Sequence, residues 1–65
     1  MEDKIKYVLQ TPEGGYFVEY LLNYLVISNS ITEAMIFEDL VLASGFKKML
    51  LETCELKTII STYID

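Results

Sequence analysis

One stretch of the chain, from Ser30 to Glu52, is the only segment long and periodic enough to form a substantial helix. Apolar side chains recur in it at spacings of three and four residues, which places them on one broad helical face. These residues are Leu40, Val41, Leu42, Ala43, Phe46, Met49 and Leu50. Gly45 lies within the same run, and we interpret it as a point of close packing against a sheet. The segments on both sides have the character of strands, so we expect strands that pack against one central helix.

Two starting points for this helix are consistent with the sequence. Ser30 and Glu33 have the spacing of a capping box, which would begin the helix near Ile31. Alternatively, a short extended segment at Ile36-Phe37 precedes a helix that begins at Glu38, because acidic side chains suit the first turn of a helix. We favour the second starting point.

A proline and two glycines mark the first reversal of the chain. Thr11 to Gly15 contains these residues and separates two alternating segments, Ile5 to Gln10 and Tyr16 to Leu21. Proline presets a turn and glycine accepts a positive φ, so this pattern predicts a β-hairpin. A second turn at Leu22-Asn23 and a third strand from Tyr24 to Ser28 follow. Alternation in the return strand predicts two faces. One face carries Tyr16, Val18 and Tyr20, and the other carries Phe17, Glu19 and Leu21.

A single helix from Tyr16 to Ile27 is the alternative for this region, because its tyrosines also recur at a spacing of four. The β-branched and aromatic content favours strands. A last strand is expected from Leu56 to Ile64. The predicted fold class is therefore α+β: a small, antiparallel-rich sheet of three or four strands with one helix packed on one face, in the order β-hairpin, strand, helix, strand.

The length of the chain limits how it can be stabilised. Its 65 residues form a single predicted domain, residues 1–65, which buries only about 60% of its unfolded surface. Cys54 is the only cysteine and histidine is absent, which excludes an intramolecular disulfide and a Cys/His zinc site. Because 52% of the residues are apolar, we expect part of the surface to meet another copy of the chain in a homodimer.

The charge excludes other partners. The net charge is −5 and arginine is absent, so the chain has no basic footprint for nucleic acid and is repelled by anionic membranes. We therefore expect neither nucleic acid nor a membrane as a direct partner. The segment Met1 to Lys4 lacks the pattern of a signal peptide, and a free thiol suits a reducing compartment. These features predict a cytoplasmic protein.

Most residue types that catalysis requires are missing. Without histidine or arginine, the commonest general base and the bidentate anion clamp are absent, and Gly14-Gly15 lacks the spacing of a nucleotide-binding loop. Glu38-Asp39 could hold a hard cation together with Glu33, but an acidic first turn of a helix is the simpler explanation. Cys54 could be a reactive thiol beside Lys57, but a buried or idle cysteine is favoured. We therefore expect a non-enzymatic protein with no catalytic residue, cofactor or metal.

Tyrosine side chains are the best candidates for contact with a partner. Tyr16, Tyr20 and Tyr24, with Glu19 among them, are the predicted partner-binding residues, because tyrosine combines contact area with a hydrogen-bonding tip. The alternative is that the rings only cover the edge of the core.

A second hypothesis uses the acidic residues, which could imitate a row of phosphates and inhibit a host nucleic-acid-binding protein. These residues are Glu13, Glu19, Glu33, Glu38 and Asp39.

Three short segments and one alanine carry a resemblance to a known group of proteins. They are Lys6-Tyr7-Val8-Leu9, Gly15-Tyr16-Phe17, the run from Ile31 to Phe37, and Ala43. In these the chain resembles small proteins of unknown activity encoded by phages and prophages of Gram-positive bacteria. The resemblance spans Lys6 to about Ala43 and brings no catalytic residue with it. It implies a small accessory protein made inside a bacterial host, and we expect a homodimeric protein-binding module whose partner is a host protein.

Overall fold

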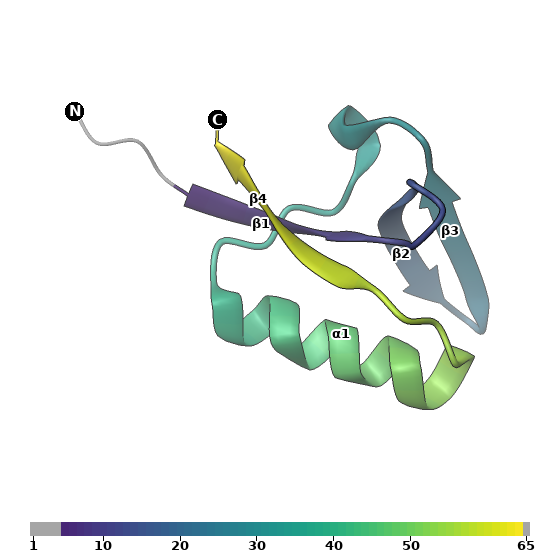
Figure 1. Cartoon of the computed structure of the whole chain (residues 1–65). Coiled ribbons are helices and arrows are strands. Elements are labelled where there is room, and N and C mark those ends of the chain that lie inside the picture. Colours follow the sequence, from purple (N-terminus) through teal and green to yellow (C-terminus); the bar gives the residue numbers. More distant parts are fainter. Residues whose placement is uncertain (1–4, 65) are drawn as a thin grey trace.

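The computed structural model describes residues 5–64 of the chain. Within that part of the chain, four strands, one short 3₁₀ helix and one α-helix are present (Figure 1). Their bounds are β1, Ile5–Gln10; β2, Tyr16–Leu21; β3, Tyr24–Ser28; η1, Ile31–Glu33; α1, Leu40–Cys54; and β4, Ile59–Ile64. The predicted α+β class and the predicted order of β-hairpin, strand, helix and strand are confirmed.

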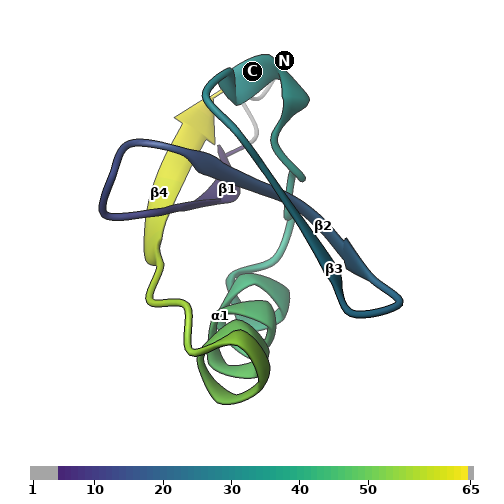
Figure 2. The same ribbon diagram turned by 90° about the vertical axis from the view of Figure 1, so that its right-hand side faces the viewer.

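The sheet consists of two antiparallel ribbons that meet at one corner. Its strand order is β3-β2-β1-β4. β1 and β4 pair along their whole length, from Ile5 opposite Ile64 to Gln10 opposite Ile59. The register between β1 and β2, by contrast, is a single pair, Gln10 with Tyr16. Figure 2 shows the consequence: the β2–β3 ribbon crosses away from the β1–β4 ribbon instead of lying flat beside it.

β2 pairs with one edge of β1 only at Gln10, and the segment between η1 and α1 pairs with that edge further along the strand. The Tyr7 N–H donates to the Phe37 carbonyl at 2.7 Å, and the Phe37 N–H donates to the Tyr7 carbonyl at 2.8 Å. The Met35 N–H donates to the Phe17 carbonyl of β2 at 3.0 Å. Buried backbone groups need such partners, so this segment closes the gap between the two ribbons. The short strand expected at Ile36-Phe37 is present as one bridge between Tyr7 and Phe37.

Both predicted turns are present. The Thr11 N–H donates to the Gly15 carbonyl at 2.8 Å, the Gly15 N–H donates to the Thr11 hydroxyl oxygen at 2.9 Å, and Gly14 has a φ of +92°. Leu22 and Asn23 have φ values of +52° and +64°, which is the left-handed pair that a type I′ hairpin turn requires. β2 and β3 are thus joined by a tight turn, and the helical alternative for this region is wrong.

A bulge interrupts the alternation of β2. The pairing with β3 shifts by one residue between Phe17 and Glu19, which leaves Val18 as the extra residue. As a result, Phe17 is buried in the core and Tyr20 also packs against it. Strict alternation predicts these two side chains on opposite faces, and that prediction is wrong because the bulge resets the face.

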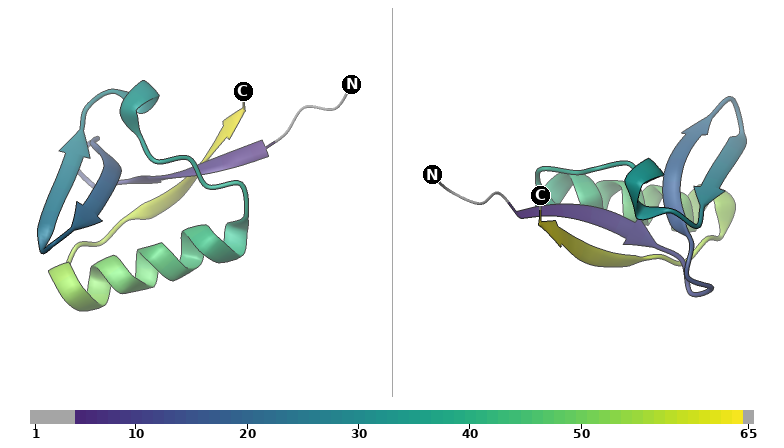
Figure 3. Two further views of the ribbon diagram at one scale, coloured as in Figure 1. Left: turned by 180° about the vertical axis from the view of Figure 1, so that it is seen from behind. Right: turned by 90° about the horizontal axis from the view of Figure 1, so that it is seen from above.

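α1 covers one face of the β1–β4 ribbon, and η1 lies on the other side of it (Figure 3, left). The core between the helix and the strands is a cluster of buried apolar side chains. Its members are Leu9, Phe17, Phe37, Ala43 and Leu50. The half-buried ring of Phe46 packs against this cluster, with its centroid 6.0 Å from that of Phe17 and 5.2 Å from that of Phe37. One helical aromatic side chain therefore connects β2, the segment after η1, and α1.

α1 begins at Leu40, close to the starting point favoured from the sequence. The Asp39 carboxylate accepts a hydrogen bond from the Val41 N–H at 2.9 Å, so Asp39 is the N-cap. The side chain of Ser30 makes no capping bond, and Ile31 begins only the short η1 helix. The capping-box start is therefore wrong, and the acidic start is wrong by two residues because the capping oxygen belongs to Asp39.

The cap at the C-terminal end of α1 explains why the last strand begins later in the sequence than predicted. Glu55 has a φ of +54°, and the Leu56 N–H donates to the Leu50 carbonyl at 3.2 Å. This left-handed cap ends the helix and reverses the chain. β4 consequently begins at Ile59 and not at Leu56, because the first residues after the helix complete the cap and return the chain to the sheet.

The helix buries a narrower face than predicted. Three side chains expected in the core are exposed: Leu40, Val41 and Leu42. Ala43 and Leu50 face the sheet, and an advance of about 100° per residue turns Val41 to the opposite side. Gly45 is also exposed, and nothing lies within 4 Å of a Cβ built on it. The interpretation of Gly45 as a close-packing site is therefore wrong.

Alanine substitutions at two glycines are expected to have opposite effects. A Cβ at Gly15 would lie 2.6 Å from Ile27 Cγ2 and 3.2 Å from the Thr11 hydroxyl oxygen. Gly15→Ala should therefore lower the free energy of unfolding by about 1–3 kcal/mol through overpacking. Gly45→Ala should raise it by about 0.5–1 kcal/mol, because alanine is the better helix former. Urea denaturation followed by circular dichroism measures both, and equal effects of the two changes would contradict this packing.

Candidate binding surface

The predicted partner-binding tyrosines do not share one surface. Tyr16 is half-buried at one end of the β2–β3 ribbon, whereas Tyr24 lies at the other end, opposite Leu21. Tyr20 packs against the core, and its hydroxyl donates to Asn23 Oδ1 at 3.1 Å. The spacing of four that relates the three rings belongs to a helix, which this segment does not form. Of the tyrosines, Tyr24 is the one that is largely free for contact.

The turn of the β2–β3 ribbon exposes three large side chains. The exposed fractions are 63% for Leu21, 92% for Leu22 and 70% for Tyr24. We call these three residues the hairpin tip. Figure 2 shows the turn at the end of its ribbon, away from β1 and β4. Contiguous apolar side chains that project in this way are typical of surfaces that bind another protein.

Leu22 is an unfavourable residue for its backbone conformation. In the left-handed region the Cβ of an L-residue crowds the following carbonyl oxygen, at a cost of roughly 1–2 kcal/mol. Glycine, asparagine and aspartate are the usual residues there, and Asn23 at the next position conforms to this rule. Leu22 instead weakens the turn and presents a nearly fully exposed apolar side chain. Residues held in sparsely populated conformations cluster at functional sites, which singles out this leucine.

Tyr20 and Cys54 meet where β2 lies near the end of α1. Burial of the Tyr20 side chain, followed by the effect of the neighbouring Cys54, raises the pKa of the Tyr20 hydroxyl above its ordinary value. Cys54 is half-buried, and its Sγ lies 3.6 Å from the Thr53 hydroxyl oxygen. These contacts place the thiol at the edge of the core, where a small apolar side chain fills space.

The carboxylates come from separate parts of the fold. Glu13 lies in the β1–β2 turn, Glu19 on β2, Glu33 in η1, and Glu38 and Asp39 before α1. Two of them have structural partners: Glu33 accepts a hydrogen bond from the Ser28 hydroxyl, and Asp39 caps α1. Within residues 5–64, no group of three or more histidine, cysteine, aspartate or glutamate residues is arranged to hold a metal ion.

Only Tyr24 of the hairpin tip is among the residues predicted from the sequence. The sequence signal that could have identified Leu22, and Leu21 beside it, was the dipeptide Leu22-Asn23. A two-residue hairpin turn is expected to begin with asparagine, aspartate or glycine, and this one begins with leucine. A leucine in that position is informative only once the turn type is known. The sequence predicted the turn but not its backbone conformation, so the exposed leucines were missed.

Comparison with protein-family models, with curated proteins and with solved structures finds no match for this chain. In the part of the chain that the structure describes, no helix is long and apolar enough to cross a membrane. The function of this chain must therefore be inferred from its own geometry.

Asn23 is expected to stabilise the hairpin in two ways, through its left-handed φ and through the hydrogen bond from Tyr20. Asn23→Ala should lower the free energy of unfolding by about 1–2 kcal/mol, because it removes both. Asn23→Gly should cost less, since glycine keeps the backbone conformation. Asn29→Ala, at an exposed position outside the strands, is the matched control and should change stability by no more than about 0.5 kcal/mol. Thermal or urea denaturation distinguishes the three variants.

Proposed function

We propose that this protein is a non-enzymatic protein-binding module that forms a homodimer through the hairpin tip and the outer edge of β3. The observation that carries the proposal is Leu22, which is 92% exposed in a left-handed turn position. A residue that weakens the free monomer is explained if its side chain becomes buried in a complex. Burial of one leucine side chain contributes about 1.5–3 kcal/mol, which offsets the backbone cost.

The edge of β3 supplies a second surface beside the hairpin tip. β3 is an outer strand of the sheet, so one row of its backbone N–H and C=O groups has no strand partner within the described chain. Edge strands are usually protected by charged residues or proline, and the sequence of β3, YLVIS, contains neither. Two copies of β3 can pair antiparallel across a two-fold axis, because such an interface is self-complementary. The hairpin tips would then flank the paired strands.

The other elements of the proposal come from the sequence. The absence of histidine and arginine supports a non-enzymatic role. The resemblance of Lys6 to Ala43 to small phage and prophage proteins supports an accessory protein that acts in the cytoplasm of a bacterial host. The acidic-inhibitor alternative needs its carboxylates on one face, and their distribution over the β1–β2 turn, β2, η1 and the approach to α1 does not favour it.

Leu22→Asn is expected to stabilise the monomer and to weaken the dimer. Asparagine suits the left-handed position, so the monomer should become more stable, by about 1 kcal/mol. Each dimer loses two buried leucines, so the dissociation constant should rise about 100-fold or more. Sedimentation velocity over a range of protein concentrations measures the association, and unfolding at the lowest concentration measures the stability of the monomer.

Val41→Gln is the matched control, because Val41 is an exposed apolar residue on α1 and outside the proposed interface. It should leave the dissociation constant unchanged. A wild-type protein that stays monomeric at about 1 mM, the weak limit of specific association, contradicts the homodimer. A dimer that Val41→Gln disrupts and Leu22→Asn does not would assign the interface to α1 instead.

A further inference from the structure

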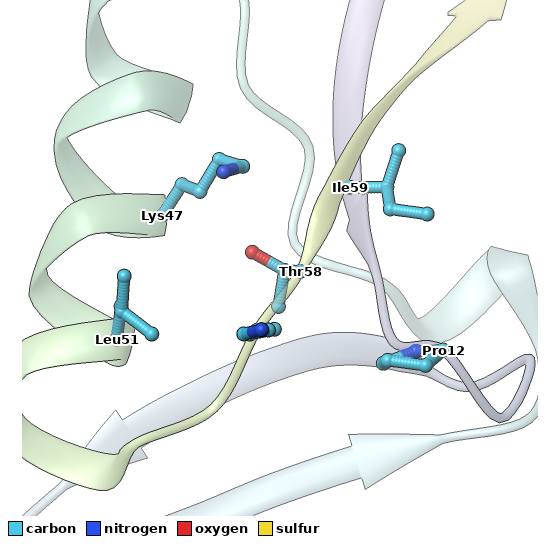
Figure 4. Close-up of a pocket in the computed structure, with 6 residues that line it drawn as sticks. Pro12, Lys47, Leu51, Thr58 and Ile59 are labelled. Carbon is cyan, nitrogen blue, oxygen red and sulfur yellow. The ribbon is translucent and has the colours of Figure 1, made fainter.

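A groove lies between α1 and the residues that lead into β4, apart from the hairpin tip. Its volume is about 390 Å³, which falls within the range of small-molecule sites. Figure 4 shows side chains from three parts of the chain around it: the β1–β2 turn, α1 and the start of β4. The lining residues are Pro12, Lys47, Leu51, Lys57, Thr58 and Ile59.

The charges of the groove are opposite in sign to the charge of the whole protein. The chain has a net charge of −5 and five lysines, yet the two charged side chains that line the groove, Lys47 and Lys57, are both cationic. The structure records no ion pair for either lysine with another described residue. Two acidic residues, Glu13 and Glu55, line an adjoining hollow that shares Pro12 and Lys57 with this groove. Within the groove itself the charged lining is cationic, with Lys47 on the side away from these carboxylates' hollow, and such a lining suits an anion.

Thr58 supplies an unsatisfied hydrogen-bonding group at the same place. The residue is 4% exposed, and its hydroxyl oxygen has no hydrogen-bond partner among residues 5–64. In Figure 4 this oxygen points toward α1, between Lys47 and Leu51. A buried hydroxyl without a partner destabilises a fold, and valine has the same shape without that penalty. The threonine is explained if its hydroxyl donates to a bound ligand.

We propose that this groove binds a small organic monocarboxylate with an apolar body. The carboxylate lies between the Lys47 and Lys57 ammonium groups and accepts a hydrogen bond from the Thr58 hydroxyl. The apolar body packs against the aliphatic walls of Pro12, Leu51 and Ile59, of which Leu51 and Ile59 are exposed in the free protein. The Thr58 hydroxyl oxygen is covered in the free protein, so its contact with the carboxylate requires a side chain at the groove wall to shift.

The test titrates the full chain with 4-phenylbutyrate, using 4-phenylbutan-1-ol as the neutral probe of the same shape. Backbone amide chemical shifts of the labelled protein locate the site, and isothermal titration calorimetry measures affinity. The expected dissociation constant for the carboxylate is on the order of 1 mM, given the size of the probe. The shifts should centre on Lys47, Leu51, Thr58 and Ile59, and the alcohol should bind at least about tenfold more weakly.

Substitutions distinguish the contribution of the lysine charges to binding from that of the Thr58 hydroxyl. Lys47→Gln and Lys57→Gln should each weaken binding about two- to fivefold, as expected for exposed charges. Lys48→Gln, on the same helix but outside the groove lining, is the matched control and should have no effect. Thr58→Val should weaken binding and also raise the thermal midpoint by about 4–8 °C, because it removes the orphaned hydroxyl. Thr58→Ser should retain binding.

Three outcomes would overturn this assignment. The first is equal affinity for the alcohol and the carboxylate, which would leave an apolar groove without anion recognition. The second is unchanged affinity in Thr58→Val together with the expected gain in stability, which would make the hydroxyl irrelevant to the ligand. The third is a set of shifts confined to the hairpin tip. The result is independent of dimer formation, because no groove residue belongs to the hairpin tip or to β3.

Discussion

The two backbone hydrogen bonds between Tyr7 and Phe37 hold the two ribbons and the helix in one arrangement. β1 and β2 share a single register pair, so the sheet alone does not define the angle between the ribbons. The extended segment that contains Phe37 bonds to β1 through its backbone and directs its ring toward Phe46 of α1. Because the same residue fixes an edge of the sheet and a contact of the helix, the position of α1 depends on it.

The core that results is small for the apolar content of the chain. In the part of the chain that the structure describes, the largest fully buried side chains are Phe17, Leu9, Leu50 and Val8. Large apolar side chains remain exposed at the hairpin tip, on the first turn of α1 and at the start of β4. A fold of this size has a large surface relative to its volume, so much of its apolar area stays exposed. This exposed apolar area is available for contact with a partner.

Local signals in the sequence were sufficient for the elements of the fold. The glycines and proline between Thr11 and Gly15 determine the first turn through their own backbone preferences. The helix followed from its period, and the strands from their β-branched and aromatic residues. Each of these signals acts within a few residues of the chain, which is why pattern reasoning identified them.

The features that were missed depend on how one element of the fold pairs with or packs against another. The bulge at Val18 is a property of the pairing between two strands, and it decides that Tyr20 faces the core. The exposure of Val41 depends on which side of α1 meets the sheet. The unsatisfied hydroxyl of Thr58 is visible only when α1 and β4 are placed together. For the candidate surfaces, the sequence indicated which residue types are suited to binding. It could not show which of those residues would lie together on the surface.

The pairing of β1 with β4 has a consequence for how the chain folds. Ile5 lies opposite Ile64, so almost the whole described chain separates two residues that are neighbours in the sheet. Contacts between residues so distant in sequence form late, because a long loop must close before they contribute. The β2–β3 hairpin and α1 can form from local contacts, whereas β1 must wait for the last strand to be synthesised. During that interval β2 pairs with β1 only at Gln10, and the Phe37 segment is the part of the chain that pairs with β1 at Tyr7.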